Sequence, residues 1–112
     1  TGNSMFNSPR GVWADDSNIY VADSLNSRIM KFTASTGAFV GWKGYVATTT
    51  GMTDPNCIAA VGSATPTWCT GGTSGPAKQL GTFDTPTGLT GDLNYIYVND
   101  IRNNRIVTIP KN

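Results

Sequence analysis

Residues 19–32 read IYVADSLNSRIMKF, and this stretch predicts two short strands joined by a tight polar turn. The runs at its two ends are β-branched and aromatic, as strands usually are. Ser24–Ser27 supplies the turn, because Ser and Asn side chains can bond the local backbone. Asp23 and Arg28 flank the turn, so we expect their carboxylate and guanidinium to meet and clamp the hairpin.

The same pattern occurs a second time in the chain. Residues 96–106 read IYVNDIRNNRI, with the same internal spacing. Asp100 follows Asp23 by 77 positions, and Arg105 follows Arg28 by the same 77 positions. We therefore expect a second hairpin clamp between Asp100 and Arg105.

The repeat extends upstream at the same offset, and its residues resemble a known family. Residues 6–12 (FNSPRGV) match residues 83–89 (FDTPTGL). Both copies resemble the NHL repeats of β-propellers, whose pattern is a Phe, a Pro-x-Gly with an apolar strand, an apolar-Tyr-Val-x-Asp strand, an Asn and an Arg-Ile strand. The resemblance covers residues 6–44 and 83–109.

This resemblance implies an all-β fold made of NHL-type β-propeller blades, which are antiparallel four-stranded sheets. Residues 1–44 would form one complete blade, with Thr1–Met5 as a polar lead-in. Residues 45–82 would be an irregular insertion, and residues 83–112 a second, incomplete blade. Four strands in about 40 residues is the period of a blade.

The positions of the strands follow from the apolar runs between turn residues. In the first blade we expect strands at Gly11–Ala14, around Tyr20, around Ile29 and at Ala38–Trp42. The second blade has only three, at Thr87–Thr90, Tyr95–Val98 and Arg105–Ile109, so its last strand would keep an unpaired edge. Candidate contacts with another chain at that edge are Arg105, Ile106, Val107 and Ile109.

The insertion is rich in Thr, Gly and Pro and has little periodicity, which predicts a loop. A loop of this length is usually functional or disordered. Its threonine run is a candidate for glycosylation at Thr48, Thr49 and Thr50. The segment from Cys57 to Gly72 also resembles a loop of large bacterial NHL-repeat proteins.

The insertion holds both cysteines of the chain, Cys57 and Cys69. We expect a disulfide between them, worth about 3 kcal/mol for a loop of this length in the chain-entropy model. Two free thiols are the alternative; a metal site lacks ligands, because the chain has no His and no further Cys. A disulfide implies an oxidising compartment. With a Thr-rich, weakly charged composition, it favours an extracellular or cell-surface protein, and the resemblance to bacterial NHL-repeat proteins implies secretion by a prokaryote.

Few residues suit catalysis or the binding of charged partners. The chain has no His and no Glu, its net charge is +1, and it has no apolar run near the ~18 residues of a membrane span. We therefore expect no enzyme activity, no cofactor, no nucleic-acid partner and no membrane span. Asp15, Asp16 and Asn18 could bind calcium in a turn, but their spacing is not that of a calcium loop. Some NHL propellers are lyases that depend on metal-binding His residues, so that activity does not carry over.

The expected function is a structural or interaction module of an extracellular NHL-repeat assembly, a fibre or a multi-blade ring. Repeat units bury their faces only against neighbours, so the partners would be other copies of the chain or further blades of a longer one. Two alternatives remain open. The chain could be a fragment of a larger propeller enzyme whose site lies on other blades, or a carbohydrate-binding protein that uses Trp42, Tyr45 or Trp68.

Overall fold

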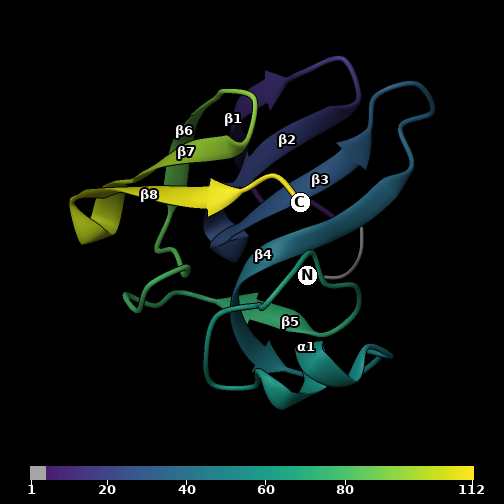
Figure 1. The fold of residues 1–112 in the computed structure, drawn as a ribbon. Coiled ribbons are helices and arrows are strands. Elements are labelled where there is room, and N and C mark those ends of the chain that lie inside the picture. Colours follow the sequence, from purple (N-terminus) through teal and green to yellow (C-terminus); the bar gives the residue numbers. More distant parts are fainter. Residues whose placement is uncertain (1–4) are drawn as a thin grey trace.

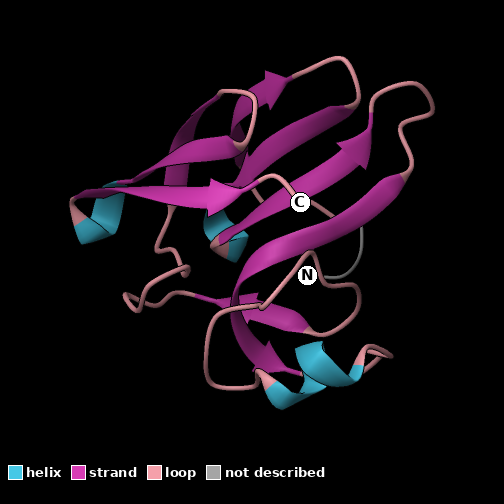
Figure 2. Ribbon diagram, viewed as in Figure 1, coloured by secondary structure: helices cyan, strands magenta, loops and turns pink. Residues whose placement is uncertain are grey.

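A computed structural model describes residues 5–112, and strands dominate it (Figures 1 and 2). The first sheet is antiparallel and keeps the chain order β1 (Pro9–Ala14), β2 (Asn18–Asp23), β3 (Arg28–Thr33), β4 (Phe39–Thr48) and β5 (Thr73–Gly75). The second is antiparallel with β6 (Pro86–Gly91), β7 (Tyr95–Asp100) and β8 (Arg105–Pro110). Three short helices are η1 (Ser24–Asn26), α1 (Pro55–Ala59) and η2 (Ile101–Asn103). The expected all-β fold with antiparallel sheets is confirmed.

Two parts of the chain have the same local structure. We call β1–β4 unit 1 and β6–β8 unit 2. The bounds of β1, β2, η1 and β3 recur 77 positions later as those of β6, β7, η2 and β8. Both first strands carry an irregularity at the same place, between Pro9 and Val12 and between Pro86 and Leu89. The sequence repeat is therefore a structural repeat.

Side-chain alternation along the strands gives each unit two faces. In unit 1, Tyr20 and Ala22 of β2 lie on one face with Ile29 of β3, and Val21 and Met30 lie on the other. Tyr20, Ala22 and Ile29 are fully buried. Residues of unit 2 cover this face.

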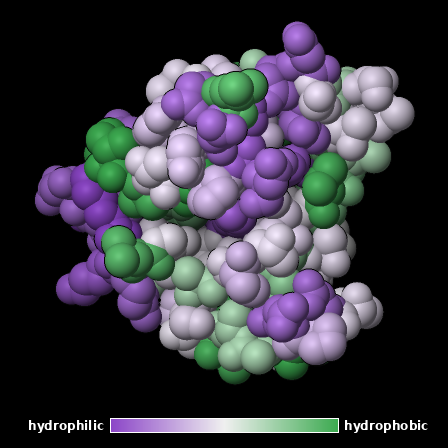
Figure 3. Space-filling model, in the orientation of Figure 1, coloured by the Kyte–Doolittle hydropathy of each residue, from purple (hydrophilic) through white to green (hydrophobic). Residues whose placement is uncertain are grey.

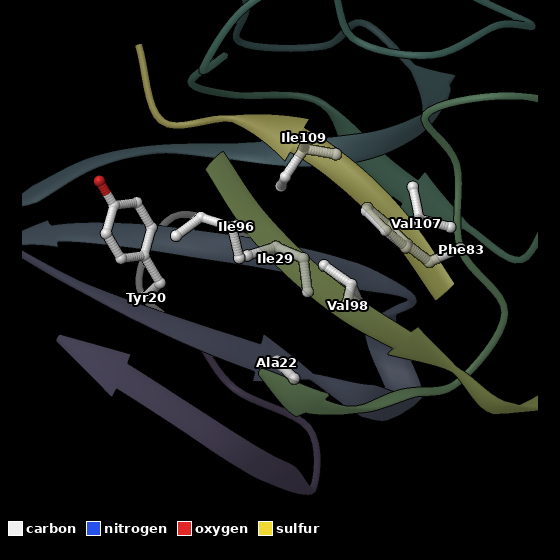
Figure 4. Close-up of a cluster of buried hydrophobic side chains, with 8 residues drawn as sticks. All are labelled: Tyr20, Ala22, Ile29, Phe83, Ile96, Val98, Val107 and Ile109. Carbon is white, nitrogen blue, oxygen red and sulfur yellow. The ribbon is translucent and has the colours of Figure 1, made fainter. Parts of the chain in front are cut away.

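A core of eight buried residues joins the two units (Figure 4). Unit 1 contributes Tyr20, Ala22 and Ile29, and the second half of the chain contributes Phe83, Ile96, Val98, Val107 and Ile109. At the same interface β6 contacts both β1 and β2, and the second sheet lies beside them in Figure 1. Burying a large apolar side chain stabilises a fold by roughly 1.5–3 kcal/mol. This core therefore holds unit 2 face to face against unit 1.

The insertion contains more regular structure than its composition predicts. The strand β4 continues to Thr48, past the expected start of the insertion at residue 45, and β5 pairs with its far end. The helix α1 follows Asp54, whose side chain accepts a hydrogen bond from the amide of Asn56, and begins with Pro55. Asp before a first-turn Pro is a helix-start signal. The prediction of a wholly irregular insertion is therefore corrected to one short helix, one short strand and connecting loops.

A second buried cluster lies where the insertion meets unit 1. Its members are Met30, Trp42, Val46, Met52, Cys57, Ala60 and Cys69. Phe32 and Phe39 pack against this cluster, whereas Trp13 packs against the core between the units. The insertion is thus part of the fold, and of the lead-in Thr1–Met5 only Met5 lies within the described residues.

Candidate interaction surface

Each hairpin turn is closed by an ion pair. Oδ2 of Asp23 lies 2.8 Å from Nε of Arg28, and neither side chain is exposed. Oδ2 of Asp100 lies 2.9 Å from Nε of Arg105, whose side chain is 26 % exposed. The sequence placed these four residues as two clamps, and the structure brings each pair into contact.

Each of these aspartates also holds the chain that leads into its unit. Oδ1 of Asp23 accepts a hydrogen bond from the amide of Asn7 at 2.7 Å. Oδ1 of Asp100 accepts the equivalent bond from the amide of Asp84, also at 2.7 Å. One carboxylate therefore fixes both the turn and the entry to the first strand.

The guanidinium of Arg105 is occupied by the end of the insertion. It donates to the carbonyl oxygens of Lys78, Gln79 and Thr82 at 2.8–3.0 Å. Its polar atoms are directed toward this segment and toward Asp100, so the side chain acts mainly inside the chain.

The strand β8 forms one edge of the second sheet. It pairs with β7, and no strand within residues 5–112 pairs with its other edge. The side chains of Val107 and Ile109 lie in the core, so only their backbone can contact another chain. The side chain of Ile106 is 66 % exposed. Of the four residues expected to make assembly contacts, Ile106 therefore offers the largest apolar surface.

An open hollow of about 380 Å³ lies beside Ile106. Its lining residues are Asn99, Ile101, Asn104, Arg105 and Ile106. Ile101 is half exposed, and the hollow is lined by two isoleucines and three polar residues. Figure 3 shows apolar side chains at the surface on the side where β7 and β8 meet η2, next to a strongly hydrophilic group. We call this face of β7 and β8, with its hollow, the outer face of unit 2.

In the turn considered for calcium binding, the carboxylate of Asp15 is bonded to other groups of the chain. Oδ1 of Asp15 accepts hydrogen bonds from the amides of Ser17 and Asn18, and Oδ2 lies 2.7 Å from Nζ of Lys111. The hydrogen bond from Lys111 lowers the pKa of Asp15 to about 2. The carboxylate thus serves as a turn cap and as a partner of Lys111.

A group of lysines around Trp68 was not predicted from the sequence. Nζ of Lys31 donates to the carbonyl oxygen of Lys111 at 2.7 Å, and Nζ of Lys43 to that of Pro110 at 3.4 Å. Both ammonium groups lie 5.3 Å from the centre of the Trp68 ring, a cation–π arrangement. Burial lowers the pKa of both lysines. These contacts tie the end of β8 to unit 1.

The insertion carries the predicted disulfide. Cys57 and Cys69 are bonded, with an S–S distance of 2.00 Å. The glycosylation candidates Thr48 and Thr50 are exposed, and Thr49 is half buried. The hydroxyl of Thr48 is hydrogen-bonded to that of Thr73 at 2.8 Å.

The aromatic residues considered for sugar binding are mostly enclosed. Trp42 is fully buried and donates from Nε1 to the carbonyl oxygen of Gly71. The indole of Trp68 packs on Tyr20 with ring centres 5.7 Å apart. Tyr45 is half buried. No flat, exposed aromatic platform is formed by these three residues.

Residues 5–112 form neither a cluster of metal ligands nor a membrane-spanning helix. These residues contain no group of three or more His, Cys, Asp or Glu side chains that could hold a metal ion. No helix in the same range is long and apolar enough to cross a membrane.

No protein-family model matches the chain, and no curated protein matches it either. The resemblance to NHL repeats therefore rests on the repeated residues themselves. What the chain shows on its own is two equivalent antiparallel units, one packed on the other, with one face and one edge of unit 2 uncovered among the described residues.

Proposed function

We propose that the chain is a non-enzymatic structural and interaction module of an extracellular assembly of NHL-type β-propeller blades. In this proposal unit 1 is a complete four-stranded blade and unit 2 a blade with three strands. The partners are other copies of the chain or further blades of a longer one.

The packing of unit 2 on unit 1 carries this proposal. Unit 1 buries Tyr20, Ala22 and Ile29 against unit 2, while unit 2 leaves the equivalent face and the edge of β8 open. Repeat units of this kind bury their faces by stacking on neighbours, and two blades are too few to close a propeller. An uncovered strand edge also invites pairing with another chain.

The proposed location rests on the disulfide between Cys57 and Cys69. Disulfides persist in oxidising surroundings, which for a prokaryote means outside the cytoplasm. Thr48 and Thr50 are exposed residues, which makes the insertion a candidate carrier of glycans. We propose secretion to the cell surface on this basis.

The experiment is to measure the mass and shape of the purified, oxidised chain over a range of concentrations. Sedimentation velocity should give species larger than one chain as the concentration rises, and electron microscopy should show rings or fibres. A chain that stays monomeric at every concentration would contradict the assembly role. Catalytic activity in that monomer would favour the alternative of an enzyme fragment.

A further inference from the structure

The internal repeat predicts which surface of unit 2 is built for contact. Adding 77 to the buried residues Tyr20, Ala22 and Ile29 gives Tyr97, Asn99 and Ile106. Asn99 and Ile106 are exposed, and Tyr97 is half exposed. These three residues alternate with the core residues of β7 and β8, so they lie on the outer face of unit 2. The outer face of unit 2 is therefore equivalent to the face of unit 1 that packs against unit 2.

The equivalent of the hollow is filled in unit 1. Its lining residues Ile101, Asn104 and Ile106 correspond to Ser24, Ser27 and Ile29. There Thr85 and Pro86 contact the two serines, and Phe83 is buried in the core that contains Ile29.

The hydroxyl of Ser24 donates to the carbonyl oxygen of Pro86, and the amide of Thr85 donates to Oγ of Ser27 at 3.4 Å. Phe83 is fully buried in the core that contains Ile29. Figure 4 shows the Phe83 ring beside Val107. A Phe-x-x-Pro segment is therefore what this kind of surface receives.

The chain holds a second segment of that kind, and it is uncovered. Phe6–Pro9 corresponds to Phe83–Pro86, and the side chain of Phe6 is 45 % exposed. Its ring packs on Phe32 of the same unit, with ring centres 5.7 Å apart. Val12, the counterpart of the packed residue Leu89, is 64 % exposed. On its outer side unit 1 therefore presents the part of the complementary surface formed by Phe6 and Val12, while Met30, the counterpart of Val107, is already buried under the insertion.

We propose that the outer face of unit 2 binds unit 1 of a second copy of this chain, head to tail, with Phe6 of that copy in the hollow beside Ile106. This inference deepens the proposed function and rests on it. The occupant is a second copy because one chain carries both halves of the contact. A contact between two different surfaces closes into a ring or continues as a filament.

A glycine on the outer face of unit 2 supports this arrangement. A Cβ at Gly11 would overlap the carbonyl oxygen of Thr87 and lie 3.0 Å from the amide nitrogen of Leu89, so unit 2 approaches unit 1 closely there. The counterpart Gly88 has only Cβ of Asn99 near that position, at an ordinary 3.5 Å. Gly88 leaves room for the backbone of a second copy around Val12.

The contact between copies is expected to be weaker than the one inside the chain. Asn99 stands where unit 1 has the buried Ala22, so the outer face of unit 2 is more polar than its counterpart at this position. Burying more polar surface leaves less net free energy for association. Assembly should therefore be reversible and concentration-dependent.

The test uses one substitution on each surface. Phe6→Asp alters the unit 1 surface, Ile106→Asp alters the hollow, and Val61→Asp in the insertion is the control, since Val61 is 55 % exposed and lies outside both surfaces. Sedimentation velocity should show that either of the first two raises the concentration for half-assembly by about tenfold or more, as loss of an interface anchor does. Val61→Asp should assemble as the unaltered chain does.

Mixing the two variants gives the decisive result. Phe6→Asp keeps an intact hollow and Ile106→Asp keeps an intact Phe6, so an equimolar mixture should form dimers that do not grow further. Formation of this dimer also shows that both variants are folded. A mixture that stays monomeric, or a single variant that assembles like the unaltered chain, overturns the head-to-tail contact.

Gly88→Ala gives an independent check with little risk to the fold. It should leave the circular dichroism spectrum of the monomer unchanged and reduce assembly by about tenfold, because the added methyl group would meet the second copy. If the unaltered chain assembles while Phe6→Asp, Ile106→Asp and Gly88→Ala do not weaken it, this surface is wrong and the assembly role stands. If the unaltered chain never assembles, the proposed function fails with it.

Discussion

The carboxylate of Asp23 and the guanidinium of Arg28 meet at 2.8 Å with both side chains wholly shielded from solvent. In the equivalent pair, Asp100 is buried but Arg105 remains partly exposed. A buried charge that loses its partner is costly, whereas a charge that reaches water is not. The two pairs, although equivalent in sequence, should therefore differ in their contribution to stability.

We expect Asp23→Ala to lower the free energy of unfolding by about 3–5 kcal/mol, because it leaves the buried Arg28 without its carboxylate. Asp100→Ala should cost less, since Arg105 keeps three carbonyl acceptors and access to water. Urea unfolding of both variants measures the difference. Equal losses, or an unchanged melting temperature for Asp23→Ala, would contradict this account.

Reduction of the Cys57–Cys69 disulfide should lower stability by about 3 kcal/mol, because the bond restricts the unfolded chain over a loop of this length. Both cysteines belong to the buried cluster with Met30 and Trp42, so the loss of stability should extend into unit 1. Urea unfolding with and without a reductant measures it. The double substitution of both cysteines by alanine should reproduce the effect, and a reduced protein as stable as the oxidised one would refute it.

Stability should fall in acid through Asp15. Its folded pKa is about 2, against an ordinary value of 3.8, because Lys111 donates a hydrogen bond to the carboxylate. A lowered folded pKa means that the stabilisation is fully present above about pH 4 and is lost as the pH falls toward 2. Asp15→Asn can still cap the turn through its side-chain oxygen but cannot form the ion pair.

The check is the melting temperature between pH 5 and pH 2. Asp15→Asn should flatten the decline between pH 4 and pH 2, and the neighbouring Asp16→Asn, which lies outside the ion pair, should leave it unchanged. A decline of the same steepness in the Asp15→Asn variant would show that other carboxyl groups dominate the acid response.

The hairpins could be predicted because each depends on residues close in sequence. Asp23 and Arg28 are five positions apart on either side of a turn, and the second copy at Asp100 and Arg105 made the pattern hard to obtain by chance. Both copies then gave the same bonds in the structure, down to the amides of Asn7 and Asp84.

The insertion could not be predicted in the same way, because its order comes from contacts distant in sequence. The backbone of Trp42 is hydrogen-bonded to that of Cys69 in the insertion, and no local sequence pattern encodes this pairing. Lys31 and Lys43 are buried because they bond to Lys111 and Pro110 at the end of β8. These partners lie 80 and 67 positions further along the chain. The start of α1 was the exception, since Asp54 followed by Pro55 is a local signal that could have been used.

Gly11 and Gly88 hold equivalent positions in the two units. Gly11→Ala should lower the free energy of unfolding by about 1–3 kcal/mol, because the methyl group would press against the backbone of Thr87 and Leu89 and push the units apart. Gly88→Ala should leave the isolated chain as stable or slightly more stable, since its Cβ meets only Asn99 at an ordinary distance and Ala suits a strand better than Gly by roughly 0.5–1 kcal/mol. Urea unfolding at concentrations where the chain is monomeric separates the two. If both substitutions cost the same, the close approach of β6 to β1 is not what requires a glycine at position 11, and the packing of unit 2 on unit 1 must be held by the side-chain core alone.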